Sequence, residues 1–212
     1  EIRKLIQMGE ISEIGYDAQI NLEKIIAINP DVVFAYGLDN NSIARYEKLQ
    51  EIGIPVIFVS DFLEETPLGR TEWIKFFSCF YDNFDYANEY FDSVAHNYEQ
   101  IRSEVIKTAK INPKIILNLP WKGTWWVPGK DSYFANFILD AGGKYKMTDK
   151  KKQESIPLSL EEVFSNSQDA KIWLNPNTAS KRSDIINSEP RLKDFLPVNE
   201  SRIYNNNKRL NR

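Results

Sequence analysis

Three tryptophans within six residues are the most distinctive chemical feature of this sequence. Trp121, Trp125 and Trp126 lie in a Pro- and Gly-rich segment, residues 120–130, that follows a predicted strand. Indole rings stack on flat or apolar molecules, and open α/β sheets bind ligands beyond the carboxyl ends of their strands. We therefore predict a loop whose tryptophans form an aromatic wall. The alternative is that one or two of these rings pack over a helix of their own domain.

A second group of candidate residues surrounds the start of the helix predicted from Pro67 onward. Arg70 lies near the N-terminus of this helix, which already favours anions, so Arg70 is a candidate to grip an anionic ligand group. The alternative is an ion pair with Glu72 or with a neighbouring carboxylate such as Glu65. Trp73 is a candidate stacking residue, and the alternative for it is a place in the core.

Two further candidates follow predicted strands. Tyr36 ends a short apolar run just before Gly37, and Asn175 follows Trp173 and Leu174 at the matching place later in the chain. Ligands bind at such strand ends in parallel sheets, so we predict that both side chains contact a ligand. The alternative is that each side chain caps a neighbouring backbone group.

The residues that most catalytic sites need are scarce. His96 is the single histidine and Cys79 the single cysteine, which excludes a metal site built from several His or Cys ligands and argues against a Ser–His or Cys–His nucleophile. His96 lies off the apolar stripe of its predicted helix and should face solvent. No glycine-rich nucleotide-binding motif occurs. We predict no enzymatic activity, no catalytic residue, no bound metal and no cofactor.

Composition narrows the partners. The 212 residues carry a net charge of −3, with 42% hydrophobic and 13% aromatic residues. The sequence has no basic stripe, so nucleic acid is not predicted as a partner. It also has no apolar run of about 18 residues that would span a membrane.

The elements that must position these residues read as two α/β units joined by one long helix. Helix, strand, helix and strand alternate over residues 21–59, which is typical of a parallel sheet. Apolar residues spaced by three or four over residues 84–105 predict one helix of about 25 residues. The alternation restarts at residue 114 and includes a capping-box pattern that begins at Ser159. We predict an N-terminal lobe over residues 1–83, an interlobe helix over 84–110 and a C-terminal lobe over 111–212.

This pattern resembles the periplasmic binding proteins for iron siderophores, haem and cobalamin. The resemblance rests on several long segments, which are INLEKIIAINPDVVFAYG, LQEIGIPVIFVSDFLEETPLGRTEWIKFF, PWKGTWWVPGKDSYFANFILDAGGKY, IPLSLEEVFSNSQDAKIWLNP and RLKDFLPVNESRIYNNNKR. The second segment is similar to Bacteroidetes-type members. The resemblance implies two Rossmann-like lobes with parallel sheets, truncated here at both ends, that bind an iron chelate, haem or corrinoid between them.

The resemblance also implies partners and a location. It implies a monomer that delivers its ligand to a membrane permease of an ABC importer and is held in the periplasm by a lipid anchor ahead of residue 1. Family members dock through an acidic residue on each lobe; the candidates are Glu47 in the first lobe and Asp184 or Glu189 in the second. Two alternatives stay open, a sugar-binding protein and a chelatase-like or nitrogenase-like enzyme on the same frame.

Overall fold

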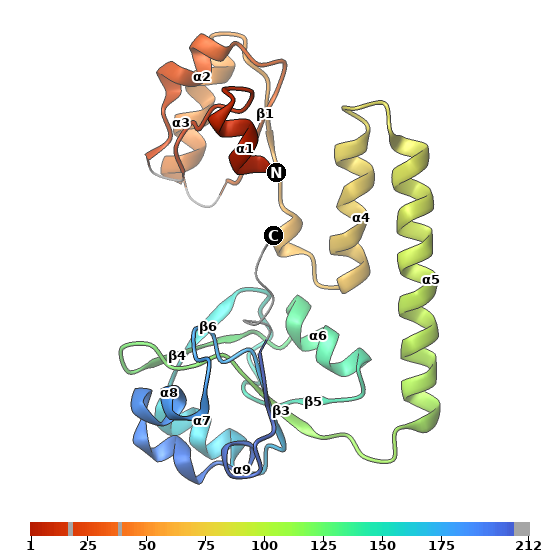
Figure 1. Cartoon of the computed structure of the whole chain (residues 1–212), viewed down its shortest axis with the longest axis vertical. Coiled ribbons are helices and arrows are strands. Elements are labelled where there is room, and N and C mark those ends of the chain that lie inside the picture. Colours follow the sequence, from red (N-terminus) through yellow and green to blue (C-terminus); the bar gives the residue numbers. More distant parts are fainter. Residues whose placement is uncertain (17–18, 38–39, 206–212) are drawn as a thin grey trace. The chain divides into compact units, whose positions relative to one another are not determined.

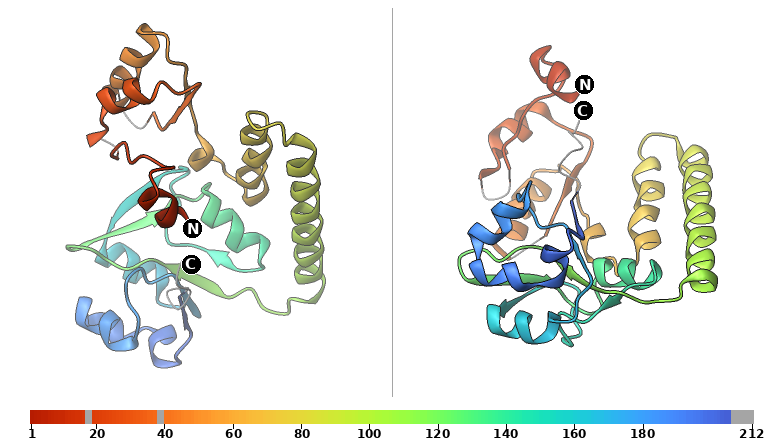
Figure 2. Two further views of the ribbon diagram at one scale, coloured as in Figure 1. Left: turned by 45° about the horizontal axis from the view of Figure 1, so that its top comes forward. Right: turned by 60° about the horizontal axis from the view of Figure 1, so that its bottom comes forward.

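The predicted long helix is present as a single element, α5 (Phe84–Thr108). It packs beside α4 (Pro67–Ser78), and the two helices form a hairpin in every view of the ribbon (Figures 1 and 2). Ala87 on the apolar stripe is buried, while Phe91 and Val94 are half-buried. The prediction of one continuous helix is confirmed. No helix in the part of the chain that the structure describes combines the length and apolarity needed to cross a membrane.

The computed structural model describes residues 1–16, 19–37 and 40–205 and separates into two units. Unit 1 is Glu1–Ser60 and unit 2 is Asp61–Arg212. Helices α4 and α5 thus share a unit with the C-terminal half of the chain. The three-part division at residues 83 and 110 stays a prediction.

Unit 1 is a small α/β body around one parallel strand pair. Asn21 caps the first turn of α2, since its side-chain oxygen accepts from the Lys24 N–H at 2.9 Å. Strands β1 and β2 pair in parallel with Val33 opposite Val56. The elements are α1 (Ile2–Gln7), α2 (Leu22–Ile28), β1 (Val33–Ala35), α3 (Asn40–Glu51) and β2 (Val56–Phe58).

Unit 2 continues from α5 into a four-stranded parallel sheet with strand order β5-β3-β7-β8. Its core is apolar, with Ile116 and Val163 fully buried. The predicted capping box is present, because the Ser159 side chain accepts from the Glu162 N–H and the Glu162 carboxylate accepts from the Ser159 N–H. The remaining elements are η2 (Asp61–Leu63), β3 (Lys114–Leu117), β4 (Thr124–Pro128), α6 (Tyr133–Asp140), β5 (Lys144–Tyr145), β6 (Ser155–Ser159), α7 (Leu160–Ser167), β7 (Ile172–Leu174), α8 (Arg182–Ser188), η3 (Pro190–Asp194), α9 (Leu196–Asn199) and β8 (Ile203–Tyr204).

The prediction that residues 120–130 form a loop is wrong. Residues 124–128 of this segment form strand β4, which pairs antiparallel with β6 in a separate two-stranded sheet. Its proline at residue 128 is the last strand residue, where a missing N–H is tolerated. The tryptophans therefore belong to regular structure, and the alternation of a strand decides which of them meet solvent.

Candidate functional site

Two asparagines mark the carboxyl edge of the unit 2 sheet. Asn118 and Asn175 directly follow β3 and β7, which are neighbouring parallel strands with Leu117 opposite Leu174. Both asparagines have a left-handed backbone, with φ of 62° and 49°. The structure therefore brings the predicted residue Asn175 to the same edge as Asn118, at the strand ends where open α/β sheets bind ligands.

Trp121 and Trp126 present their rings to solvent close to this edge. The chain reverses at Lys122 and Gly123, whose positive φ angles of 49° and 78° suit a type I′ turn. The turn places Trp121 opposite Thr124 in an isolated bridge. Trp121 is 64% exposed and Trp126 is 47% exposed. The side-chain amide of Asn118 donates to the Trp126 carbonyl at 2.9 Å, which ties the Trp126 backbone to the sheet edge.

Trp125 has no surface for a ligand, so its prediction as a contact needs correction. The side chain is fully buried, stacks on Trp173 with ring centroids 5.5 Å apart, and donates from its indole N–H to the Leu117 carbonyl at 2.9 Å. Trp125 points to the opposite face of β4 from Trp126, because successive strand residues alternate. The alternative of a core ring therefore holds for Trp125.

Arg70 lies on the first turns of α4, where Thr66 caps the helix by accepting from the Gly69 N–H at 3.0 Å. The guanidinium carbon of Arg70 is 5.3 Å from the centroid of the Tyr133 ring, a cation–π distance. Its Nε is 3.7 Å from Asp61 Oδ2. Arg70 therefore pairs with a neighbouring carboxylate, as the alternative held, although that acid is Asp61 and neither Glu72 nor Glu65; 43% of the Arg70 side chain is exposed.

Trp73 lies one turn further along α4 and is half-buried. Its indole N–H donates to Glu64 Oε1 at 2.9 Å, and its ring meets the edge of Phe76 at 5.4 Å. Because its polar end is already bonded, Trp73 offers a ligand part of its ring face only.

The start of α4 is fixed to the rest of unit 2 through Glu65. The Glu65 carbonyl accepts from the side-chain amide of Asn136 on α6 at 2.9 Å, and its carboxylate accepts from the Gln153 amide. The segments around Gly129 and Lys152 touch backbone to backbone, because a Cβ added at Gly129 would lie 2.1 Å from the Lys152 carbonyl oxygen. This contact holds Gln153, the next residue, close to the segment around Gly129. Strand β4 leads through Gly129 into α6, and the start of α4 is bonded to α6. Arg70 therefore lies near the end of β4 that leads to α6, and Trp121 lies near the other end.

Tyr36 follows β1 in unit 1 and is 49% exposed. It lies at the carboxyl end of its strand, as predicted from the sequence. Its role as a ligand contact stays a prediction.

The predicted docking acids differ in how their carboxylates are used. Glu47 is exposed on α3. Hydrogen bonds from the backbone N–H of Ser180, and then from the Ser180 hydroxyl and the Lys181 N–H, hold the pKa of Asp184 below its usual range. The Arg191 guanidinium likewise lowers the pKa of Glu189. Asp184 and Glu189 therefore already stabilise the turns around α8.

The single histidine and the single cysteine both lie at the surface, as was predicted for His96. His96 is exposed on α5, and Cys79 is an exposed free thiol at the end of α4. Over the described ranges, no three His, Cys, Asp or Glu side chains gather closely enough to hold a metal ion.

Three residues of this site were missed by the sequence reasoning. Asn118 follows a leucine at a strand end, as Asn175 does, and this repeated Leu-Asn pattern is a signal that could have identified it. Asp61 and Tyr133 have no comparable local signal, because the folded chain alone brings residues 61, 70 and 133 together. The arrangement offers π surfaces, carboxamides and one guanidinium, which suits binding rather than bond breaking.

Comparison with known proteins identifies the family. Residues 3–210 match the family described as periplasmic binding protein, and the chain therefore belongs to that family. Two uncharacterized lipoproteins of Methanocaldococcus jannaschii are 31% and 26% identical to it, each over 96% of this chain. The chain spans about half the length of these relatives, 49% and 54%.

Solved structures with the same fold include three binding proteins. The periplasmic vitamin B12 binding protein of Vibrio cholerae has a TM-score of 0.68 at 15% identity, covering 94% of this chain and 73% of that one. The haem complex of IsdE of S. aureus has a TM-score of 0.69 at 18% identity, covering 94% of this chain and 76% of that one. The siderophore binding protein of Vibrio cholerae with bound Fe3+-Desferal has a TM-score of 0.66 at 15% identity, covering 92% of this chain and 73% of that one. These likenesses confirm the predicted fold class, α/β with parallel sheets and one long helix.

Proposed function

We propose that the chain is the solute-binding part of an ABC importer and captures an iron chelate, haem or corrinoid on the aromatic edge of unit 2. The observation that carries the proposal is the pair of exposed indoles, Trp121 and Trp126, on a rigid hairpin beside Asn118 and Asn175. Large exposed aromatic rings on ordered strands offer contact area at low entropic cost.

The contacts divide by type. Trp121 and Trp126 stack against the flat or apolar part of the ligand, and Asn175 donates to or accepts from its polar rim. Arg70 and Trp73 on α4 supply a charged and an aromatic contact. Trp125 is not part of the proposal because it is sealed in the core.

Membership of a binding-protein family supports a non-enzymatic role. The structures that share the fold are described as binding B12, haem or a siderophore, and none of these descriptions names a sugar. An ABC permease is the proposed partner, with Glu47 and either Asp184 or Glu189 as docking acids. The lipoprotein names of the M. jannaschii relatives support a lipid anchor and a location outside the cytoplasmic membrane.

The test is a binding titration followed by tryptophan fluorescence, with cyanocobalamin, haem and a set of ferric siderophores. We expect one of these classes to bind, and Trp121→Ala or Trp126→Ala to weaken binding about tenfold, since loss of one stacking ring costs about 1–1.5 kcal/mol. The matched control is Tyr86→Ala, because Tyr86 is a 69% exposed aromatic residue on α5, outside the proposed site. Absence of binding by every class, or equal losses in all three variants, would refute the proposal.

A further inference from the structure

The two carboxylate oxygens of Asp61 differ in their surroundings. Its Oδ2 is 3.7 Å from Arg70 Nε, which is beyond hydrogen-bonding distance. Its Oδ1 is buried, and within the described part of the chain it has no hydrogen-bonding partner. The Asp61 side chain is only 20% exposed. A charged oxygen left without a donor in such a place is costly, so Asp61 strongly attracts the nearby guanidinium.

Arg70 is therefore shared between two neighbours. One face of its guanidinium lies over the Tyr133 ring, which is itself parallel to the Phe137 ring at 6.0 Å. Its Nε edge faces Asp61. With 43% of its side chain exposed, Arg70 keeps donors that a ligand can reach without displacing either neighbour.

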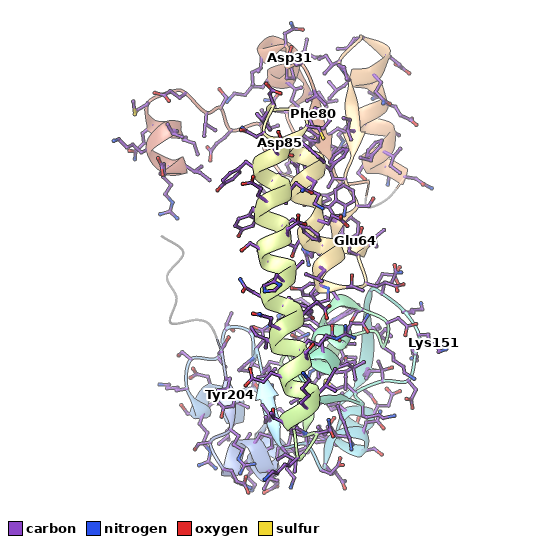
Figure 3. All side chains as sticks on the ribbon, turned by 90° about the vertical axis from the view of Figure 1, so that its right-hand side faces the viewer. Asp31, Glu64, Phe80, Asp85, Lys151 and Tyr204 are labelled. Atoms are coloured by element: carbon purple, nitrogen blue, oxygen red, sulfur yellow. The ribbon has the colours of Figure 1, made fainter. Side chains whose placement is uncertain are left out.

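Arg70 follows a short acidic segment of the chain. Residues 61–65 carry three carboxylates, whereas Arg70 is the cation on the adjoining turns of α4. Two of these acids have assigned partners, because Glu64 accepts from Trp73 and Glu65 from Gln153, both of which are uncharged. Figure 3 places Glu64 beside α4, while Lys151 extends at the outer edge of the unit. Asp61 is therefore the acid of this segment that faces Arg70, and an anion arriving there meets its negative charge.

We propose that Asp61 makes the Arg70 subsite selective for uncharged ligand groups, such as carboxamides and neutral hydroxamate chelates, over carboxylates and anionic chelates. This inference rests on the proposed function and names the ligand class within it. An amide carbonyl accepts one hydrogen bond from the exposed edge of Arg70 and leaves the Asp61 contact in place. A carboxylate competes with Asp61 for the same cation and is repelled by it, which also leaves Asp61 less satisfied.

The experiment uses matched ligand pairs that differ in charge. One pair is cobinamide, whose side chains are amides, and cobyrinic acid, which carries carboxylates on the same ring. The other pair is an uncharged ferric trihydroxamate and an anionic ferric tricatecholate. Dissociation constants are measured for the unaltered chain, for Asp61→Asn, and for the control Glu72→Gln. The control removes one negative charge from α4, the helix that carries Arg70, where Glu72 pairs with Lys75 at 3.2 Å.

The unaltered chain should prefer the uncharged member of whichever pair it binds. Asp61→Asn should tighten binding of the anionic member about fivefold, since one unit charge removed from about 7 Å at an intermediate dielectric is worth about 1 kcal/mol. The uncharged member should change less than twofold, and Glu72→Gln should leave the ratio unchanged. Asp61→Ser provides the same test if the asparagine variant fails to fold.

Three results would overturn the inference. They are tighter binding of the anionic member by the unaltered chain, an unchanged ratio in Asp61→Asn, and an equal shift in Glu72→Gln, which would indicate net charge rather than Asp61. If none of the four ligands and none of the wider set above binds the unaltered chain, the proposed function itself fails, which is a separate outcome.

Discussion

Replacement of Trp125 by phenylalanine tests the stability of the unit 2 core apart from its proposed ligand-binding edge. Trp125 is fully buried, stacks on Trp173 and donates to the Leu117 carbonyl. Loss of a donor to a buried carbonyl costs about 1–3 kcal/mol. A smaller ring leaves a cavity of roughly 40 Å³, which adds about 1 kcal/mol. We therefore expect the free energy of unfolding to fall by about 2–4 kcal/mol.

The assay is urea unfolding followed by far-UV circular dichroism, together with a thermal melt. For a unit of this size the melting temperature should fall by about 5–15 °C, since each kcal/mol shifts it by about 2–4 °C. The matched control is Trp126→Phe, the next residue along the same strand, whose ring is 47% exposed; it should change stability by less than about 0.5 kcal/mol. Equal losses in the two variants would show that strand alternation does not divide the tryptophans as described.

Three further predictions concern the frame that holds the site. Asp140 accepts a hydrogen bond from a tyrosine of α5 at 2.8 Å and pairs with an arginine of α5 at 2.9 Å. Asp140→Asn should therefore weaken the attachment of α5 to the rest of unit 2 by about 1 kcal/mol. Hydrogen exchange over residues 98–105 should quicken about fivefold. Gly129→Ala should destabilise unit 2 by about 2 kcal/mol or more in chemical unfolding, because the new Cβ would collide with a backbone carbonyl at 2.1 Å. The pKa of Asp184 is lowered in the folded chain, so its contribution to stability is present above its ordinary pKa of about 4 and is lost as the pH falls below that value; the melting temperature should drop over that range, less steeply in Asp184→Asn. A melting temperature that is flat between pH 5 and 3 would contradict the last prediction.

Local signals in the sequence predicted the long helix of unit 2 and the alternation of helix and strand in unit 1. Apolar residues at helical spacing over residues 84–105 predicted α5, and Ser159 with Glu162 predicted the start of α7. These signals act over three or four residues, so they do not depend on the rest of the chain. The error over residues 120–130 has a matching cause, because β4 is a strand only through its pairing with β6, which is about 30 residues away.

The site was predicted unevenly for the same reason. Asn175 at a strand end and Arg70 at a helix start were found because each is defined by its own element. Which tryptophan a ligand can reach was not predictable, because residue type is identical at positions 125 and 126 and only the strand register buries one of them. An ion pair of Arg70 with a neighbouring carboxylate was among the alternatives, but the Tyr133 ring was missed, since it is distant from Arg70 in sequence.

The sequence by itself determined the class of elements, the long helix and the supply of aromatic and amide side chains, because propensity, periodicity and capping are local properties of the chain. Tertiary structure alone decided the burial of Trp125, the exposure of Trp121 and Trp126, and the sharing of Arg70 between Asp61 and Tyr133. These outcomes depend on strand register and on contacts between distant segments, which no short window of sequence contains.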